Sequence, residues 1–272
     1  MSLHLTELGK KSAYITQYTP DLLFPIERKI KRDEIHVLEK IPFHGYDLWN
    51  AYEISWLNQK GKPIVAIAEI TVPATSTYLV ESKSFKLYLN SFNQTTFQNE
   101  QAVQKCITED LSRATQSTVA VNLITRLNDQ SAQFSNLNGA CLDDLDINVN
   151  QYIPDVSLLT TENTIVTETI HSHLLKSNCL VTGQPDWGSI EIQYSGNKIN
   201  HKNLLKYLIS FRQHNEFHEQ CVERIFMDIL NQCQPTELTV YARYTRRGGL
   251  DINPYRSTIA KYLFRNPRLP RQ

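Results

Sequence analysis

The chain has 272 residues, of which 41% are apolar and 10% aromatic, a composition typical of a globular protein and not of a disordered or fibrous one. Its 28 basic residues balance its 28 acidic residues, so no overall charge attracts DNA, RNA or an anionic membrane. At this length we expect two domains, or one domain of about twice the usual size.

The cysteine content indicates a reducing compartment. The cysteines are odd in number and form neither a CxxC pair nor the close spacing of a small disulfide framework. They are Cys106, Cys141, Cys179, Cys221 and Cys233. The N-terminal residues lack the apolar core of a secretory leader, and no apolar run approaches the roughly 18 residues that a membrane span needs. We therefore expect a cytoplasmic protein that does not enter a membrane.

The first half of the chain predicts strand, helix pair and strand. IVAIAEITV, from Ile64, alternates apolar and polar residues with the period of a half-buried strand. Two helices are expected to follow from Glu81. TVAVNLI, from Thr118, is a further strand. The segment over 127–170 is polar, acidic and rich in asparagine, so we interpret it as a connector.

The second half predicts the same order of elements. SIEIQY, from Ser189, and TVYARY, from Thr239, have the strand period. Between them lie two apolar sets at helical spacing, with Asn215 as the expected N-cap of the second helix. The first set is Leu204, Leu205, Leu208 and Phe211, and the second is Phe217, Cys221, Ile225 and Ile229.

An internal repeat links the two halves. At an offset of 119 residues, ESKSFKLYLNSFNQTTFQNEQAV from Glu81 aligns with NHKNLLKYLISFRQHNEFHEQCV from Asn200, and the matches include Glu100 with Glu219 and Val103 with Val222. We predict an α+β protein made of two copies of one module, each an antiparallel sheet with a helix pair on one face. The expected boundaries are an N-terminal segment 1–62, modules 63–126 and 171–272, and the connector 127–170.

One loop of the second half carries a candidate nucleophile. Cys179 lies seven residues before Asp186, and the turn formers Gly183 and Pro185 stand between them. A thiolate is a strong nucleophile, and a neighbouring carboxyl group can supply the proton that an addition to an unsaturated carbon requires. The alternative is a buried structural cysteine and a turn aspartate, which is the more frequent reading of these two residue types alone.

The predicted second helix of this half carries His218, Glu219 and Cys221 within one turn. A buried carboxylate such as Glu219 can accept two N–H bonds from the edge of a guanine-like ring. A solvated glutamate and a packed histidine remain the alternative. A further alternative is a zinc site with an open position, formed by His218, Cys221 and Cys179.

Two segments are candidates for binding a phosphorylated cofactor. No GxGxxG motif follows a predicted strand, so a Rossmann domain is not indicated. ESKSFK and TRRGGLD instead supply basic side chains, and the glycines of the second allow a close backbone approach to an anion. The basic residues are Lys83, Lys86, Arg246 and Arg247, and the glycines are Gly248 and Gly249. A solvated charged surface is the alternative.

Four segments together resemble the 7-cyano-7-deazaguanine reductases of the queuosine pathway, in their longer two-module form. They are VESKSFKLYLNSF, CLVTGQPDWGSIEI, FRQHNEFHEQC and TRRGGLDINPYRS. The resemblance implies a tandem tunnelling fold with four-stranded sheets, a homodimer, a 7-deazaguanine base as substrate and NADPH as cofactor. It implies no direct contact with nucleic acid.

The resemblance also implies site residues. Cys179 is expected to attack the nitrile carbon to give a covalent thioimide, and Asp186 to donate a proton. The implied substrate contacts are Val80, Glu81, Ser82, His218 and Glu219, and the implied NADPH contacts are Ser82, Lys83, Arg247 and Gly248. No metal ligand is implied. Two other functions stay open: a zinc-dependent cyclohydrolase of the same fold, and a non-catalytic module that binds a purine or tRNA.

Overall fold

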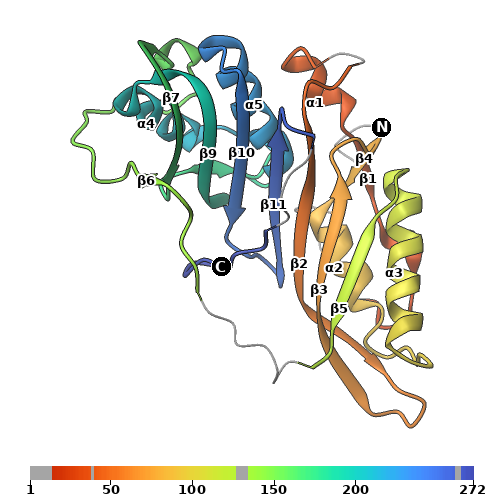
Figure 1. Cartoon of the computed structure of the whole chain (residues 1–272). Coiled ribbons are helices and arrows are strands. Elements are labelled where there is room, and N and C mark those ends of the chain that lie inside the picture. Colours follow the sequence, from red (N-terminus) through yellow and green to blue (C-terminus); the bar gives the residue numbers. More distant parts are fainter. Residues whose placement is uncertain (1–13, 38–39, 127–133, 261–264) are drawn as a thin grey trace. The chain divides into compact units, whose positions relative to one another are not determined.

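The computed structural model describes residues 14–37, 40–126, 134–260 and 265–272 (Figure 1). The chain forms two compact units, each assembled from separate stretches of sequence. The first unit draws on Met1–Ile30, Tyr46–Ala132 and Arg246–Ile252. The second draws on Lys31–Gly45, Gln133–Thr245 and Asn253–Gln272.

The first unit is an antiparallel sheet with two helices on one face. Its strands β2 (His44–Leu57), β3 (Pro63–Pro73) and β5 (Ala120–Ile124) follow one another in the order β5-β3-β2. Helices α2 (Ser82–Asn90) and α3 (Glu100–Thr115) cover the sheet, as Figure 1 shows in orange and yellow. The short strands β1 (Pro25–Glu27) and β4 (Tyr78–Val80) pair separately, and the 3-10 helix η2 (Pro20–Leu22) precedes them.

The alternation read in the sequence accounts for the core of this unit. Every second residue of β3 is buried, from Ala66 to Val72, and these side chains pack against the apolar faces of α2 and α3. Strand β2 behaves differently, because all residues from Tyr46 to Ala51 are buried on both of its faces. A bulge between Ala51 and Ile54 shifts the pairing of β2 with β3.

The second unit repeats this plan. Strands β7 (Thr161–Ser172), β9 (Pro185–Ile199), β10 (Glu237–Tyr244) and β11 (Leu250–Ser257) pair antiparallel in the order β11-β10-β9-β7. Helices α4 (His201–Ser210) and α5 (His218–Cys233) lie on one face, with the 3-10 helix η5 (Phe211–Gln213) between them.

Short elements complete the description. Strand β6 (Ala140–Cys141) pairs in parallel with β7, β8 (Lys176–Asn178) pairs with β9, and η4 (Val156–Leu158) precedes β7. Helix α1 (Lys29–Glu34) follows β1. Within the described residues no helix is both long and apolar enough to cross a membrane.

The predicted α+β class with two related modules is confirmed. The offset of 119 residues holds for the first helix of each unit, because the N-cap residue is Glu81 in α2 and Asn200 in α4. It also relates Tyr88 to Tyr207, each of which donates from its hydroxyl to an aspartate of the next helix.

The predicted alignment of the second helix of each unit, α3 with α5, is wrong by one residue. Those aspartates, Asp110 and Asp228, are 118 residues apart, as are the left-handed C-cap residues Gln116 and Gln234. The second unit therefore has one residue fewer between equivalent positions of its two helices, because Tyr88 and Asp110 are 22 residues apart and Tyr207 and Asp228 are 21 apart. The chance identities of Glu100 with Glu219 and of Val103 with Val222 had concealed this shift.

The observed elements also cross the expected module boundaries. Strand β2 lies in the segment 1–62, which had no predicted structure, and β7 begins inside the expected connector 127–170. Residues Arg246–Ile252, expected in the second module, belong to the first compact unit. Residues 127–133 of the connector lie outside the described part of the chain.

Candidate active site

Cys179 sits in a tight hairpin loop between β8 and β9. The N–H of Cys179 donates to the carbonyl of Gln184 at 2.8 Å, and the N–H of Gly183 donates to the carbonyl of Cys179 at 3.0 Å. Gly183 has a φ of +67°, a conformation that a residue with a side chain rarely adopts. The loop therefore holds the Cys179 thiol, which is only 5% exposed, on a backbone fixed at both ends.

Asp186 and His218 come together at the foot of this hairpin. Asp186 lies in β9 opposite Ser177 of β8, and its carboxyl oxygen Oδ1 is 3.1 Å from Nε2 of His218. The ring of His218 is stacked on the ring of Tyr244, with centroids 3.9 Å apart and planes 4° apart. Tyr244 thus places one face of the imidazole, and Asp186 lies at its Nε2 edge.

The loop before α5 is hydrogen-bonded to the strand that precedes Cys179. The N–H of Asn178 donates to the carbonyl of His214 at 2.8 Å, and the N–H of Glu216 donates to the carbonyl of Asn178 at 3.0 Å. Asn215 accepts a hydrogen bond from the side chain of Asn178, and the N-cap of α5 is Phe217, so the N-cap prediction at Asn215 is wrong. The asparagine serves to join two loops instead.

Polar atoms of the first turn of α5 are buried. Glu219 is 2% exposed, which removes the alternative of a solvated helical glutamate. Nδ1 of His218 and the side-chain amide of Gln220 are buried without a hydrogen-bond partner among the described residues. Unsatisfied buried polar atoms are costly, so a site that presents them is suited to a polar ligand.

Cys221 lies deeper than Cys179 and is chemically different from it. Burial raises the pKa of the Cys221 thiol to about 12, against the opposing effect of the hydroxyl groups of Tyr244 and Ser177. Such a thiol is not a nucleophile at neutral pH. Within the described residues, Cys179, His218 and Cys221 do not form a group with ligand atoms close enough for one metal ion, so the zinc alternative lacks a geometric basis.

Tyr244 and Ser177 are site residues that the sequence analysis missed. Strand alternation places Tyr244 on the same buried face as Val240 and Ala242, and nothing local distinguishes it from a core residue. Its proximity to His218 depends on the packing of α5 against β10, which no spacing in the sequence reveals.

The implied substrate residues of the first unit lie where β4 leads into α2. Val80 ends β4, Glu81 caps the helix, and Ser82 is its first residue. The carboxylate of Glu81 accepts from the N–H groups of Lys83 at 2.8 Å and Ser84 at 2.7 Å. Burial raises the pKa of Glu81, and these two N–H groups partly offset that effect.

The four implied cofactor residues all belong to the first unit. Ser82 and Lys83 start α2, and one turn later Lys86 lines a pocket of about 100 Å³ together with Gly248 and Gly249. Both glycines have positive φ, +59° and +78°. A Cβ atom on Gly248 would lie 2.9 Å from Cδ of the flexible Lys86 side chain, so the positive φ is the stronger reason for glycine at this position.

Lys86 and the acidic residue Glu53 both line this pocket, and two arginines precede its glycines in the sequence. Arg246 is exposed and lies over the ring of Tyr52 at 4.9 Å, Arg247 is half-buried, and Nζ of Lys86 is 3.6 Å from a carboxylate oxygen of Glu53. Flexible glycine backbone beside several cations is the chemistry that binds phosphate groups. The residues therefore fit a phosphate group of a dinucleotide.

Family models match both halves of the chain. The model of the family described as "Nitrile reductase, 7-cyano-7-deazaguanine-reductase N-term" matches residues 14–123. That of the family described as "QueF-like protein" matches residues 185–262. Among solved structures, that of the archaeosine synthase QueF-Like in the apo form has a TM-score of 0.31 and 12% identity, over 38% of this chain and 99% of that chain.

Curated relatives match nearly the whole chain. A protein of Coxiella burnetii is 58% identical over 269 residues, which are 98% of this chain and 96% of the relative. One of Cupriavidus taiwanensis is 58% identical over 97% of both chains, and one of Azoarcus sp. is 56% identical over 92% of this chain and 90% of the relative. Each is named NADPH-dependent 7-cyano-7-deazaguanine reductase. The chain belongs to this family of nitrile reductases.

Proposed function

We propose that the hairpin of Cys179 and Asp186 is the catalytic centre at which this chain reduces the nitrile of 7-cyano-7-deazaguanine to an aminomethyl group. The chain is an NADPH-dependent nitrile oxidoreductase by family. The observation that carries the assignment of residues is the Asp186–His218 contact at 3.1 Å beside the thiol loop. It joins a nucleophile, a proton carrier and a buried polar surface in one unit.

Cys179 supplies the nucleophile. Its sulfur forms a bond to the nitrile carbon, one π bond of the nitrile breaks, and the nitrogen takes up a proton to give a thioimide. The product of this addition has a polarised carbon–nitrogen double bond, which accepts hydride more readily than a nitrile does. Expulsion of the thiolate after the first reduction restores Cys179 and leaves an imine for the second.

Asp186 supplies protons to the substrate nitrogen, and His218 holds its carboxyl group in place. The carboxyl is 3% exposed, so water does not compete for the proton. Since Nε2 of His218 faces Asp186 and the ring is stacked on Tyr244, only Nδ1 of the imidazole is available to a ligand. His218 thus links proton transfer to contact with the base.

Recognition of the base falls to buried acceptors. Glu219 is a carboxylate of the α5 first turn, and a carboxylate accepts the paired N–H groups of a guanine-like edge. His218, Val80, Glu81 and Ser82 are the other proposed substrate contacts. A base lacking these N–H groups leaves the buried carboxylate unsatisfied, which is a strong basis for selectivity.

The first unit binds the cofactor in this proposal, through Ser82, Lys83, Arg247 and Gly248. When bound, NADPH supplies the two hydride equivalents that turn a nitrile into a primary amine. The cations bind the phosphate groups as charge-assisted donors, and the positive φ of Gly248 lets the backbone approach them. Neither function requires a side chain from the catalytic hairpin.

We further propose a cytoplasmic homodimer that does not bind nucleic acid directly. The five cysteines are all free, as suits a reducing compartment. The arginines near the C-terminus are engaged within the second unit: Arg243 donates to Gln272 at 2.8 Å, and Arg256 donates to Glu223 at 2.8 Å. Buried, paired arginines are a poor surface for phosphate.

The test is the stoichiometry of NADPH oxidation, followed by absorbance with 7-cyano-7-deazaguanine in limiting amount. The intact chain should consume two NADPH per nitrile, and Cys179→Ala should lose at least about 10³-fold in turnover while it still binds the base. Glu219→Ala should weaken base binding itself. Equal turnover in the intact chain and in Cys179→Ala would remove the covalent route.

A further inference from the structure

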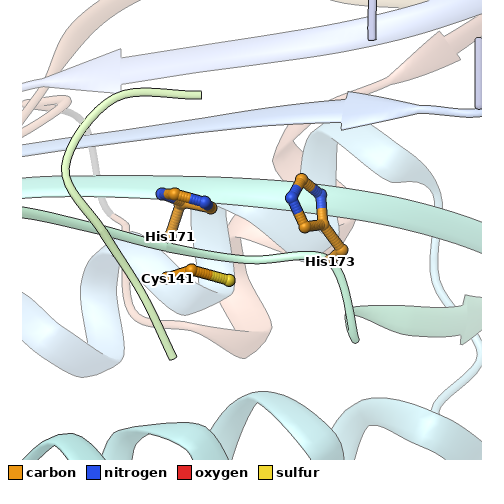
Figure 2. Close-up of side chains that lie close together, drawn as sticks. All are labelled: Cys141, His171 and His173. Atoms are coloured by element: carbon orange, nitrogen blue, oxygen red, sulfur yellow. The ribbon is translucent and has the colours of Figure 1, made fainter. Parts of the chain in front are cut away.

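A second cluster of reactive side chains lies at the C-terminal end of β7 and includes neither Cys179 nor Asp186. It consists of Cys141 on β6, His171 on β7 and His173 just beyond that strand (Figure 2). The thiol sulfur and one ring nitrogen from each histidine all lie within 4.8 Å of one another. The proposed reduction uses none of these residues.

The backbone places the three side chains together. His171 is the penultimate residue of β7, and His173 directly follows the strand, where its backbone N–H donates to the carboxylate of Asp143 at 3.0 Å. Cys141 is the direct partner of His171 in the parallel pairing of β6 with β7. Gly139 makes that approach feasible, since a Cβ atom there would lie 1.8 Å from the carbonyl oxygen of Thr169.

Hydrogen bonds fix the orientation of both rings. Nδ1 of His171 is 2.9 Å from the carbonyl oxygen of Asn138, which can only accept, so Nδ1 carries the proton and Nε2 keeps its lone pair. Nδ1 of His173 is 2.8 Å from the hydroxyl of Ser189. In metal sites a ligating histidine commonly donates from its other ring nitrogen to such a partner.

Charge at the cluster suits a cation. The carboxylate of Asp143 accepts from the backbone N–H of His173 at 3.0 Å and from the hydroxyl of Ser172 at 2.6 Å, so a negative charge lies beside one of the proposed ligands. A neighbouring negative charge favours a bound cation.

We propose that Cys141, His171 and His173 bind a divalent transition metal of the zinc class, with the fourth coordination position left to water. One sulfur and two imidazoles favour zinc or cobalt over magnesium or calcium, which prefer oxygen. Ligand atoms of a tetrahedral zinc site lie roughly 3.3–3.8 Å apart, so the cluster must close by about 1 Å. Cys141 is exposed on a two-residue strand and can make this movement.

The site would join β6 to the sheet of the second unit. It goes beyond the sequence-based expectation, which assigned no metal ligand, and it does not depend on the reductase mechanism. Its consequence is that the metal stabilises the segment around Gly139 and Cys141 without entering the reaction.

The experiment measures zinc bound to the full-length chain. Protein stripped with a chelator is equilibrated with Zn²⁺ against a competing chromophoric chelator, desalted and analysed by mass spectrometry for metal. The intact chain should retain one zinc, and Cys141→Ser and His173→Gln should each weaken binding at least about 100-fold. Cys141→His, which restores a nitrogen ligand, should recover part of the affinity.

Matched controls separate this site from other thiols and imidazoles. Cys106→Ser and His201→Gln remove half-buried residues outside the cluster and should leave the affinity within about twofold of the intact chain. The titration is repeated in Cys179→Ala, so that zinc on the catalytic thiol is not counted. Cobalt should give a thiolate charge-transfer band that Cys141→Ser abolishes.

Zinc below one equivalent, or zinc whose affinity is unchanged in Cys141→Ser and His173→Gln, would overturn the proposal. NADPH oxidation by the stripped chain is a separate readout. Loss of metal binding with full reductase activity would leave the proposed function intact.

Discussion

The two units share the same contacts within their helix pairs and differ in the connection that carries the proposed catalytic residues. In each, a capped helix carries a tyrosine that donates to an aspartate of the following 16-residue helix, and that helix ends on a left-handed glutamine. The connection between the first two long strands differs. It spans residues 58–62 in the first unit and 173–184 in the second, where it includes β8 and Cys179.

This difference shows which part of the module is free to vary. The sheet and helix pair set the positions of the loops, and a change of loop length leaves the core unaltered. The first residues of β3, Pro63–Ala68, include no carboxyl group, whereas Asp186 is the second residue of β9. The first unit instead offers its helix N-terminus and its glycine segment.

The largest effect should come from removing the acid of the second unit. Asp186→Asn keeps the shape of the side chain but cannot donate a carboxyl proton, so reduction should slow by roughly 10²–10⁴-fold. Covalent capture of the nitrile should slow less. Rapid mixing of enzyme with base, with and without NADPH, measures the two steps separately.

Asp228→Asn is the control for this experiment, because Asp228 is a carboxyl of the same unit that bonds to Tyr207. It should leave both rates within a few-fold of the intact chain. An equal loss in the two variants would mean that Asp186 acts through the fold alone.

A smaller effect is expected at the equivalent helix caps, where the two variants should differ in base binding and not in stability. Glu81 and Asn200 each accept from N–H groups at the start of their helix, so Glu81→Gln and Asn200→Ala should each lower the free energy of unfolding by about 1 kcal/mol. If Glu81 also contacts the base, Glu81→Gln should weaken base binding by roughly 10-fold or more, as expected for a charge-assisted hydrogen bond.

Calorimetric titration of the base into both variants decides between the two roles of Glu81. Asn200→Ala should bind the base as the intact chain does. Unchanged affinity in Glu81→Gln would restrict that residue to capping.

The smallest difference expected between the two units concerns the two tyrosine–aspartate pairs. Asp110 accepts from Tyr88 at 2.8 Å and also from Tyr18 at 2.6 Å, whereas Asp228 accepts from Tyr207 at 2.6 Å. Tyr207→Phe removes the hydroxyl donor of Asp228 and should cost about 2 kcal/mol, against about 1 kcal/mol for Tyr88→Phe. Urea unfolding of both variants measures the difference, and the reverse order would contradict it.

Local patterns predicted the fold as far as they were regular. The period-two strands and the repeat were readable because each has one buried face. Strand β2 was not predicted because its residues from Tyr46 to Ala51 are buried on both sides, which leaves no alternation to detect. The one-residue shift in the alignment of α3 with α5 was hidden by two coincidental identities.

The candidate site was predictable where function imposes a local motif. Cys179 and Asp186 lie seven residues apart in one hairpin, so their spacing was visible in the sequence. Tyr244 and Ser177 belong to different strands, and their position beside His218 and Cys221 arises only when α5 packs on the sheet. Long-range packing of this kind has no signature in a single sequence.

The interleaving of the chain has a consequence for genetic dissection. Asp251 lies late in the sequence, yet its carboxylate accepts from Asn50 at 2.7 Å and from the hydroxyl of Tyr52 at 2.8 Å in the first unit. A gene truncated between the repeats would therefore encode an N-terminal half without its own buried acceptor and without the glycines of its pocket. The repeats can be compared as modules, but neither can be transplanted as a single uninterrupted cassette.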